Sequence, residues 1–267
     1  MKTTRIAVLG AGGRMGAAII KCAVRATGIK LVAAIEQQGH PSIGKDAGEV
    51  SGIAKCGVKI SSNLRAMADA AVAIDFTLHT AVAANARLAA ELGKPMVIGT
   101  TGLDNSESAA VRAAAARVPI VWAPNMSLGV NLLFAMVSKA ASVLGPDYHV
   151  EIEETHHVHK KDAPSGTALR LGERIAAGRG VDFRTVMQYV DEESDAPAQP
   201  GKITIRSHRI GEVVGDHTVV FKSDGETVEL THHAWSRDAF ALGALCAARW
   251  VVSQAPGLYD MQTVLGL

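Results

Sequence analysis

Short apolar runs rich in β-branched residues alternate with longer alanine-rich stretches of helical period through the first half of the chain. The runs predict strands at residues 5–9, 30–35, 72–76, 95–98 and 120–122, and the longer stretches predict helices at residues 15–26, 79–92 and 106–117. Strands that alternate with helices favour parallel pairing through right-handed crossovers, with helices on both faces of the sheet. The first half of the chain is therefore expected to form an α/β domain.

The pattern changes after one more helix, which is expected at residues 129–144. From Tyr148 onward short strand-like segments dominate, and turn signals such as GEVVGDH and SDGE separate them. These strands are expected at residues 150–155, 203–207, 218–221 and 227–232, with a helix after Ser165 and a polar loop that starts at Asp191. The segment therefore predicts a second, α+β domain built on a mostly antiparallel sheet.

Near its end the chain has an alanine- and leucine-rich stretch that predicts a helix at residues 238–252. This helix has the composition of those in the first half, and we expect it to pack back on the first domain. The first domain is therefore placed at residues 1–127, completed by residues 238–267, and the second domain at residues 128–237.

Composition and charge limit the kinds of protein this can be. The 267 residues are 48% hydrophobic, enough for a sizeable core, and the net charge of +1 offers no basic surface for nucleic acid or an anionic membrane. The three cysteines are far apart and form no CxxC pair, which fits a reducing cytoplasm better than a disulfide framework. Neither a signal peptide nor a run of about 18 apolar residues is expected. We therefore expect a folded cytoplasmic protein that binds neither nucleic acid nor membrane.

The segment GAGGRMG lies between the first expected strand and the first expected helix. In a dinucleotide-binding loop, Gly10 would make the tight turn, Gly12 would let the backbone approach a pyrophosphate, and the free amides of the helix N-terminus would hold the phosphates. The spacing to Gly16 is one residue longer than the usual G-x-G-x-x-G. A simple tight connection is the alternative, but the position between strand and helix favours a Rossmann-like dinucleotide-binding domain.

Glu36 ends the second expected strand, twenty residues beyond Gly16. An acidic side chain at this place would accept hydrogen bonds from the adenosine ribose hydroxyls of NAD, although a surface glutamate would leave the same pattern. The next residues are Gln37 and Gln38 rather than Arg or Lys, so a 2′-phosphate would meet the Glu36 charge without a neighbouring cation there. Arg14 is the one nearby cation. We therefore predict that NADH is accepted and that NADPH is tolerated.

Two further turns follow expected strands. VIGTTG ends the fourth strand and WAPNMS ends the fifth, and ligands of open parallel sheets bind at the carboxyl ends of the strands. The backbone groups of Gly99, Thr100, Thr101 and Asn125 are therefore candidate contacts for the nicotinamide half of the cofactor. Ordinary strand-to-helix turns with Thr and Asn as caps would give the same sequence.

Titratable residues are concentrated in residues 151–162, where they occupy nine of twelve positions. A solvated charged loop is the simple interpretation. However, the stretch begins as a strand whose alternation puts Val150 and Ile152 on one face, and continuing that period puts Glu154 and His156 on the same face. Apolar packing would then give way to polar chemistry at the end of the strand.

The segment APSGTAL follows this stretch and looks like the start of a helix. Ser165, Gly166 and Thr167 would present free N–H groups and hydroxyls to an anion. An N-cap without a ligand is compatible with the same residues. The three are therefore candidate ligands of an anionic substrate.

A zinc site is the competing hypothesis for the histidines. His157 and His159 would be a ligand pair, but the spacing gives no third ligand, and Lys160 and Lys161 would repel a dication. No metal is therefore expected. The cationic cluster suits a substrate carboxylate better, with Lys160 as a compact donor and His156 able to pass a proton.

Taken together, GAGGRMG, GTTG, NMSLGVN and EIEETHHVHKKDAPSGTA resemble the dihydrodipicolinate reductase family, also called 4-hydroxy-tetrahydrodipicolinate reductases. The resemblance spans essentially the whole chain and includes GDHTVVF and LTHHAWSRDAFALGAL near its end. It implies NAD(P)H-dependent reduction of 4-hydroxy-tetrahydrodipicolinate, a cyclic dicarboxylate, to tetrahydrodipicolinate with loss of water, on the diaminopimelate route to lysine. It also implies a homotetramer and final helices that return to the dinucleotide-binding domain.

The resemblance implies roles residue by residue. His156 and Lys160 would be the proton-donor pair. The substrate carboxylate would be held by His157, Ser165, Gly166 and Thr167, and the cofactor would be lined by Gly10, Ala11, Gly12, Gly13, Arg14, Met15, Glu36, Gly99, Thr100, Thr101, Ala123, Pro124, Asn125 and Met126. Two positions depart from many relatives: Gln37 stands where Arg is common, and Met126 stands where an aromatic residue is frequent.

Three other functions are compatible with parts of this pattern. Another small-molecule dehydrogenase would keep Glu36 but should not need HHVHKKDAPSGT. A nonenzymatic NAD-sensing module would bind the cofactor and leave that cluster replaceable. A metal hydrolase would lose activity to a chelator.

Overall fold

The chain folds into two compact units. The computed structural model describes residues 3–190, 199 and 201–267, and most of the polar loop predicted from Asp191 lies outside these residues. The first unit comprises Met1–Leu128 and Arg237–Leu267, and the second comprises Gly129–Ser236. The first unit is therefore assembled from two separate parts of the sequence, whereas the second is continuous.

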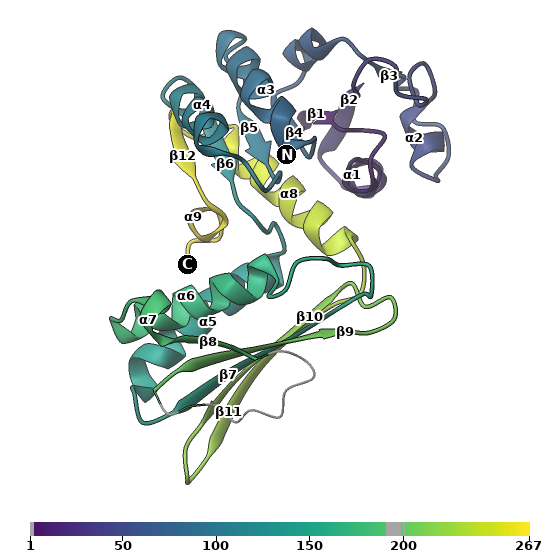
Figure 1. The fold of residues 1–267 in the computed structure, drawn as a ribbon. Coiled ribbons are helices and arrows are strands. Elements are labelled where there is room, and N and C mark those ends of the chain that lie inside the picture. Colours follow the sequence, from purple (N-terminus) through teal and green to yellow (C-terminus); the bar gives the residue numbers. More distant parts are fainter. Residues whose placement is uncertain (1–2, 191–198, 200) are drawn as a thin grey trace. The chain divides into compact units, whose positions relative to one another are not determined.

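A seven-stranded parallel sheet forms the centre of the first unit (Figure 1). Its order is β12-β6-β5-β4-β1-β2-β3, and all six pairs of neighbours are parallel. The strands are β1 (Thr4–Leu9), β2 (Ile29–Ile35), β3 (Ile60–Ser61), β4 (Val72–Asp75), β5 (Met96–Ile98), β6 (Pro119–Trp122) and β12 (Gly257–Tyr259). The predicted Rossmann-like α/β fold is confirmed.

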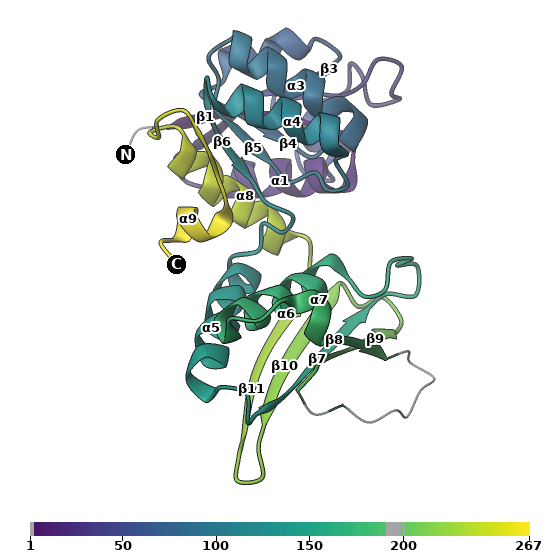
Figure 2. The same ribbon diagram turned by 60° about the vertical axis from the view of Figure 1, so that its left-hand side comes forward.

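Helices cover both faces of this sheet because its central strands are apolar on both sides. In β1, Ile6 and Val8 belong to one core, and Ala7 and Leu9 belong to the other. The first core is closed by α1 (Arg14–Arg25) and α8 (Asp238–Val251), and the second by α3 (His79–Glu91) and α4 (Asn105–Ala115). Figure 2 shows these two pairs of helices on opposite sides of the sheet. Three short elements complete the unit: α2 (Ala47–Val50), the 3₁₀ helix η1 (Leu64–Asp69) and α9 (Met261–Leu265).

The apolar pattern of the sequence misses the two edge strands, β3 and β12, which are only two and three residues long. Strand β12 comes from the C-terminal segment, and its Leu258 pairs in parallel with Ile120 of β6. The same segment contributes α8, whose buried residues join those of α1 in one core. The C-terminal segment therefore completes both an edge of the sheet and one of its covering layers.

A five-stranded sheet forms the second unit, in the order β11-β10-β7-β9-β8. Its strands are β7 (His149–His156), β8 (Met187–Val190), β9 (Ile203–Arg209), β10 (Gly215–Lys222) and β11 (Thr227–Ala234). Its helices are α5 (Leu128–Leu144), α6 (Gly166–Arg179) and α7 (Phe183–Val186). Phe134 of α5 and Leu171 of α6 share one core with Val150 of β7 and Val219 of β10. Helices α5 and α6 therefore cover one face of this sheet.

This sheet is mixed rather than mostly antiparallel. Strand β10 is antiparallel to β7 and β11, whereas β9 is parallel to β7 and β8. The physical reason is the helical connection: α6 lies between β7 and β8 in the sequence, and strands joined by a crossover helix run in the same direction. The prediction missed β8, and with it the parallel half of the sheet.

Candidate active site

A glycine loop joins β1 to α1 at the carboxyl end of the parallel sheet. Gly10 has φ +78° and donates its N–H to Ile35 O at 2.9 Å, which turns the chain sharply at the end of the strand. A Cβ on Gly16 would lie 2.1 Å from Gly10 O, so the first turn of α1 packs directly on the loop. Gly13 is the N-cap of α1 and makes no side-chain capping bond. The loop therefore has the geometry of an anion-binding helix N-terminus.

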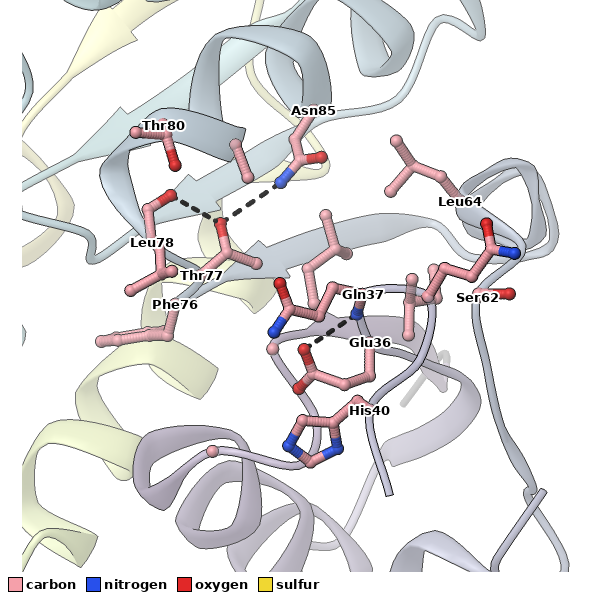
Figure 3. A pocket seen from close by; sticks show the side chains of 16 residues that line it. Glu36, Gln37, His40, Ser62, Leu64, Phe76, Thr77, Leu78, Thr80 and Asn85 are labelled. Carbon is pink, nitrogen blue, oxygen red and sulfur yellow. Dashed lines mark hydrogen bonds between the residues drawn. The ribbon is translucent and has the colours of Figure 1, made fainter. Parts of the chain in front are cut away.

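Glu36 follows β2 and lies beside this loop (Figure 3). Its Oε2 accepts the N–H of Gly12 at 2.9 Å, and its Oε1 accepts the N–H of Gln37 at 2.9 Å. It lines a pocket of about 510 Å³ in the first unit, together with Gln37, Gln38, His40, Phe76, Thr77 and Leu78. Because backbone N–H groups hold both carboxylate oxygens, the carboxylate is fixed in orientation before a ligand binds.

The fourteen predicted cofactor residues differ in where they lie. Gly10, Gly13 and Glu36 line the pocket. The side chains of Ala11, Ala123 and Met126 are buried in the core, so a role for these residues would fall to their backbone groups. The remaining eight belong to neither group: they do not line the pocket and are not part of that core. They are Gly12, Arg14, Met15, Gly99, Thr100, Thr101, Pro124 and Asn125. Of these, Asn125 accepts the N–H of Ser127 at 2.9 Å in the turn before α5.

One wall of the pocket was not predicted, and it comes from the segment after β4. Phe76, Thr77 and Leu78 line the pocket there, together with Asn85 of α3 (Figure 3). The sequence could have indicated this wall, because DFTLHT begins at the last residue of a buried strand, and that strand ends at the same edge of the sheet as VIGTTG and WAPNMS. The segment contains no glycine, and glycines marked the other candidate loops.

In the second unit, the end of β7 places ionisable side chains on the buried face of the sheet. Val150, Ile152, Glu154 and His156 alternate with more exposed residues, as the period of two predicts, and all four are buried. In the antiparallel pairing with β10, Glu154 lies opposite His217. A carboxylate and two imidazoles therefore meet at the end of an otherwise apolar core.

Glu154 is the centre of this cluster and is fully buried. Its Oε1 accepts the N–H of Ser165 at 3.0 Å and Nη2 of Arg209 at 3.1 Å, and its Oε2 is hydrogen-bonded to Nδ1 of His156. Burial by itself would raise the pKa of this carboxyl, but hydrogen bonding by His156, Ser207 and Arg209 outweighs burial and lowers the pKa to about 2. Because the carboxylate is ionised, Nδ1 of His156 donates, and Nε2 is the nitrogen left for proton exchange.

His217 is buried beside His156, and the two rings meet edge to face with centroids 5.2 Å apart. Burial, followed by the charge of His156, lowers the pKa of His217 to about 3, so this ring is neutral at neutral pH. Its Nε2 lies 3.3 Å from Oγ of Ser165, and that oxygen also accepts the N–H of Ala168 as the N-cap of α6. The cap of α6 is thus tied to both Glu154 and His217.

The sequence interpretation gave no role to Arg209 or His217, and it placed Glu154 on the correct face without a function. His217 could have been found, because GDHTVVF alternates and puts it on the buried face with Val219 and Phe221. Arg209 had no such signal. Its bond to Glu154 depends on the parallel pairing of β9 with β7, which the expected antiparallel sheet did not include.

The predicted proton donor Lys160 and the other predicted substrate-binding residues lie between the end of β7 and the first turn of α6. Nζ of Lys160 lies 2.8 and 2.7 Å from the two carboxylate oxygens of Asp162. The ring of His157 is partly buried, and its Nδ1 has no hydrogen-bond partner among the described residues. Gly166 and Thr167 form the first turn of α6. All of these residues belong to one continuous segment of the second unit.

The structure also brings together a possible metal-ligand set, different from the His157 and His159 pair suggested by the sequence. One ligand atom each from Glu154, His156 and His217 lie within 4.8 Å of one another. The carboxylate already accepts hydrogen bonds from His156 and from a guanidinium 3.1 Å away, and that positive charge would repel a dication. The arrangement therefore favours a hydrogen-bonded acid–base cluster.

The cluster predicts acid sensitivity of the fold. Unfolded His217 binds a proton near pH 6.5 and folded His217 only at about pH 3, so the unfolded state binds more protons between these values and its population rises as the pH falls. Glu154 acts in the same direction, because its stabilisation is present above pH 4.5 and is lost as the pH falls toward about 2. The free energy of unfolding, measured by urea denaturation, is expected to drop by about 3 kcal/mol from pH 7 to pH 4.

A matched pair of variants tests whether His217 causes this acid sensitivity. His217→Asn should flatten the pH dependence in that window, while His159→Gln, at a ring with 75% of its side chain exposed, should leave it unchanged. A wild type of equal stability at both pH values would contradict the buried, neutral state of His217.

A parallel sheet with a glycine loop after its first strand and an acidic residue after its second is typical of proteins that bind dinucleotides. The second unit adds a buried acid–base cluster of the kind that enzymes use for proton transfer. Together these features define the class of the protein: a two-unit oxidoreductase that uses NAD(P).

Comparison with known proteins gives the family. The family model described as dihydrodipicolinate reductase, N-terminus, matches residues 4–126, and the model for the C-terminus matches residues 129–265. A 4-hydroxy-tetrahydrodipicolinate reductase of Magnetococcus marinus is 47% identical over 265 residues, 99% of both chains. One of Anaeromyxobacter sp. is 49% identical over 263 residues, which cover 98% of this chain and 97% of that one. The chain therefore belongs to the dihydrodipicolinate reductase family, as the resemblance in its sequence implies.

Solved structures agree with this assignment. A dipicolinate-bound dihydrodipicolinate reductase from Paenisporosarcina sp. TG-14 matches with a TM-score of 0.77 at 26% identity, over 97% of each chain. GenD2 from gentamicin A biosynthesis, solved in complex with NAD, matches with a TM-score of 0.62 over 95% of this chain and 87% of that one. At 12% identity, GenD2 shares the fold alone.

Proposed function

We propose that the chain reduces 4-hydroxy-tetrahydrodipicolinate with NAD(P)H and that the cluster around Glu154 serves the proton transfer. The reaction adds one hydride and one proton, releases the 4-hydroxyl group as water, and gives tetrahydrodipicolinate on the diaminopimelate route to lysine. The observation that carries the proposal is the buried set of Glu154, His156 and His217 beside the N-terminus of α6. It stands in a chain whose relatives at 47% and 49% identity are 4-hydroxy-tetrahydrodipicolinate reductases.

The substrate carboxylates bind to the segment between β7 and α6. Gly166 and Thr167 lie in the first turn of α6, where the helix dipole favours negative charge. Lys160 adds a compact cation, and His157 adds a ring nitrogen that has no partner among the described residues. The relative solved with dipicolinate holds a cyclic dicarboxylate, which supports this class of ligand.

His156 and Lys160 form the proton-donor pair. The Glu154 carboxylate holds Nδ1–H of His156 and so leaves Nε2 for exchange with the substrate. Nζ of Lys160 is paired with Asp162, and the lysine side chain is 20% exposed, so solvent can return a proton to it. Glu154 acts through His156 and is a positioning residue.

The pocket beside Glu36 fits the adenosine half of the cofactor. A Cβ on Gly12 would lie 2.5 Å from Cε1 of His40, so a side chain at this position would displace the pocket wall. The backbone of the loop would hold the pyrophosphate, and the fixed Glu36 carboxylate would accept hydrogen bonds from the ribose hydroxyls. Leu78, 69% exposed, offers an apolar surface to adenine. The bound cofactor supplies the hydride.

Cofactor choice follows from the charge beside Glu36. Gln37→Arg is expected to raise the affinity for NADPH about tenfold and to leave that for NADH nearly unchanged, because arginine pairs with a 2′-phosphate. Gln37 lines the pocket and carries no charge. Titration calorimetry with both nucleotides measures the two dissociation constants. Gln254→Arg adds the same charge outside the pocket, and an equal gain from both variants would contradict the assignment.

The proposal extends to partners and location. The homotetramer implied by the family resemblance would assemble through the second unit, where helices α5 and α6 cover one face of the five-stranded sheet. Activity is expected to withstand a chelator, because the cluster around Glu154 works through hydrogen bonds without a metal.

In the part of the chain that the structure describes, no helix is long and apolar enough to cross a membrane. We place the enzyme in the cytoplasm.

A direct test is oxidation of NADH and NADPH by the purified protein, with the substrate generated in situ by the preceding synthase. Turnover that depends on the synthase is the expected result. Binding of NADH without turnover would keep the cofactor site and remove the substrate assignment.

A further inference from the structure

Asp75 ends β4 and is a buried carboxylate that the proposed chemistry does not use. It is 0% exposed, and no cation pairs with it among the described residues. Its Oδ1 accepts the N–H of Thr77 at 2.9 Å and the Thr77 hydroxyl at 2.7 Å, and its Oδ2 accepts Nδ2 of Asn85 at 2.8 Å. Burial raises the pKa of Asp75, and these hydrogen bonds offset part of that effect. The two Thr77 donors hold the short segment after β4 to the carboxylate, and Asn85 ties the carboxylate to α3.

That segment lies between the two loops predicted to hold the cofactor. A Cβ on Gly10 would lie 2.8 Å from Phe76 O, so the glycine loop packs on the backbone of Phe76. A Cβ on Gly99 would lie 2.1 Å from Cζ of the Phe76 ring, so the turn after β5 packs on its side chain. Thr100 of the same turn donates its hydroxyl to Thr77 O at 3.1 Å. The residue after Asp75 therefore supports both loops at once.

The segment is also a wall of the pocket beside Glu36. Phe76, Thr77 and Leu78 line it, and Asn85 closes the network from α3 (Figure 3). The Thr77 hydroxyl lies 3.3 Å from the Leu78 carbonyl oxygen and 3.3 Å from Nδ2 of Asn85. Figure 3 shows it between these two groups. A change in the bonds of Asp75 would therefore reach the pocket directly.

We propose that Asp75 is a positioning residue for the cofactor, which holds Phe76 against the glycine loop and the Gly99 turn in the geometry that binds NAD(P)H. The inference rests on the proposed function of this pocket. Asp75 is buried and acts through the side chains bonded to it, chiefly Thr77 and Asn85. When these bonds are lost, the segment must be ordered during binding, and the cost of that ordering appears as lower affinity.

Asp75→Asn is the test, because the amide keeps the shape of the carboxylate but places an N–H₂ group where an acceptor is needed. The dissociation constant of the apoprotein for NADH, measured by titration calorimetry, is expected to rise about tenfold. Glu107→Gln is the matched control. Glu107 is also a buried carboxylate of the first unit, bonded to His79 and to the N–H of Asp104, and it does not line the pocket. Its variant is expected to unfold at lower urea concentration with an unchanged NADH affinity.

A second substitution separates positioning from packing. Asp75→Asn combined with Asn85→Asp exchanges the carboxylate and the amide, so the bond between the two positions can form in the opposite direction. Recovery of NADH affinity to within about threefold of the wild type is expected. A folded Asp75→Asn with wild-type affinity, or a double variant with no recovery, would overturn the inference.

Where Asp75→Asn does not fold, Thr77→Val removes the contacts of the hydroxyl, keeps the bond from the Thr77 N–H to Asp75, and is expected to weaken NADH binding by a smaller factor. A folded Thr77→Val with wild-type affinity for NADH would again overturn the inference. A wild type that binds no NADH would instead refute the proposed function of the pocket.

Discussion

Lys160→Ala is expected to lower kcat/KM for the substrate by about 10²-fold or more, the scale of a lost positioned acid. Nζ of Lys160 lies within 2.8 Å of both Asp162 oxygens, and the side chain is mostly shielded from water, so alanine removes a fixed ammonium group. Steady-state kinetics with substrate made in situ measure the loss. A loss in kcat identifies Lys160 as a proton donor, whereas a rise in KM alone identifies it as a carboxylate ligand.

Two variants make this test specific. Lys161→Ala removes the neighbouring exposed lysine and is expected to change kcat/KM little. Lys160→Arg keeps the positive charge but replaces a group that can lose its proton with one that cannot, so it should restore substrate binding without restoring kcat. Wild-type kinetics in Lys160→Ala would remove this residue from the proton-donor pair.

Glu154→Gln is expected to lower the free energy of unfolding by about 3 kcal/mol and kcat by roughly 10²-fold. The amide cannot neutralise Arg209, whose side chain is 17% exposed, and it competes with His156 Nδ1 as a donor. Breaking a buried ion pair leaves an uncompensated charge, which explains the loss of stability. A misplaced imidazole proton explains the loss of rate.

The adjacent residue provides the control. Glu153 is exposed on the opposite face of the same strand, so Glu153→Gln changes the same functional group without touching the cluster. Urea unfolding and kcat should both stay close to the wild type. Equal losses in the two variants would mean that Glu154 affects stability and kcat only through its negative charge and not through its bonds to His156 and Arg209.

Local periodicity was enough to predict the direction in which key side chains face. Period-two alternation put Glu154 and His156 on the buried face of β7, and the strand-to-helix transitions located the glycine loop and Glu36. These features depend on neighbours in the sequence. The parallel half of the second sheet does not, because β8 is only four residues long and its direction is set by the helical crossover before it.

The contacts between distant segments could not be predicted for the same reason. Glu154 and Arg209 are 55 residues apart, and their bond exists only in the register of β9 on β7. The support that Phe76 gives to Gly10 and Gly99 likewise joins three strand ends that no local pattern connects. Sequence indicated which residues carry chemistry, and tertiary pairing determined which residues hold them in place.

The division of the first unit between two parts of the chain affects the order of folding during synthesis. Residues 129–236 form a continuous unit and emerge from the ribosome complete, whereas the dinucleotide fold lacks α8 and the edge strand β12 until residues 237–267 follow. Domains usually fold as they emerge, N-terminal first. Here the unit begun first is finished last, so a chain that ends at residue 236 contains every residue of the second unit but leaves an apolar face of the parallel sheet without the helix that covers it.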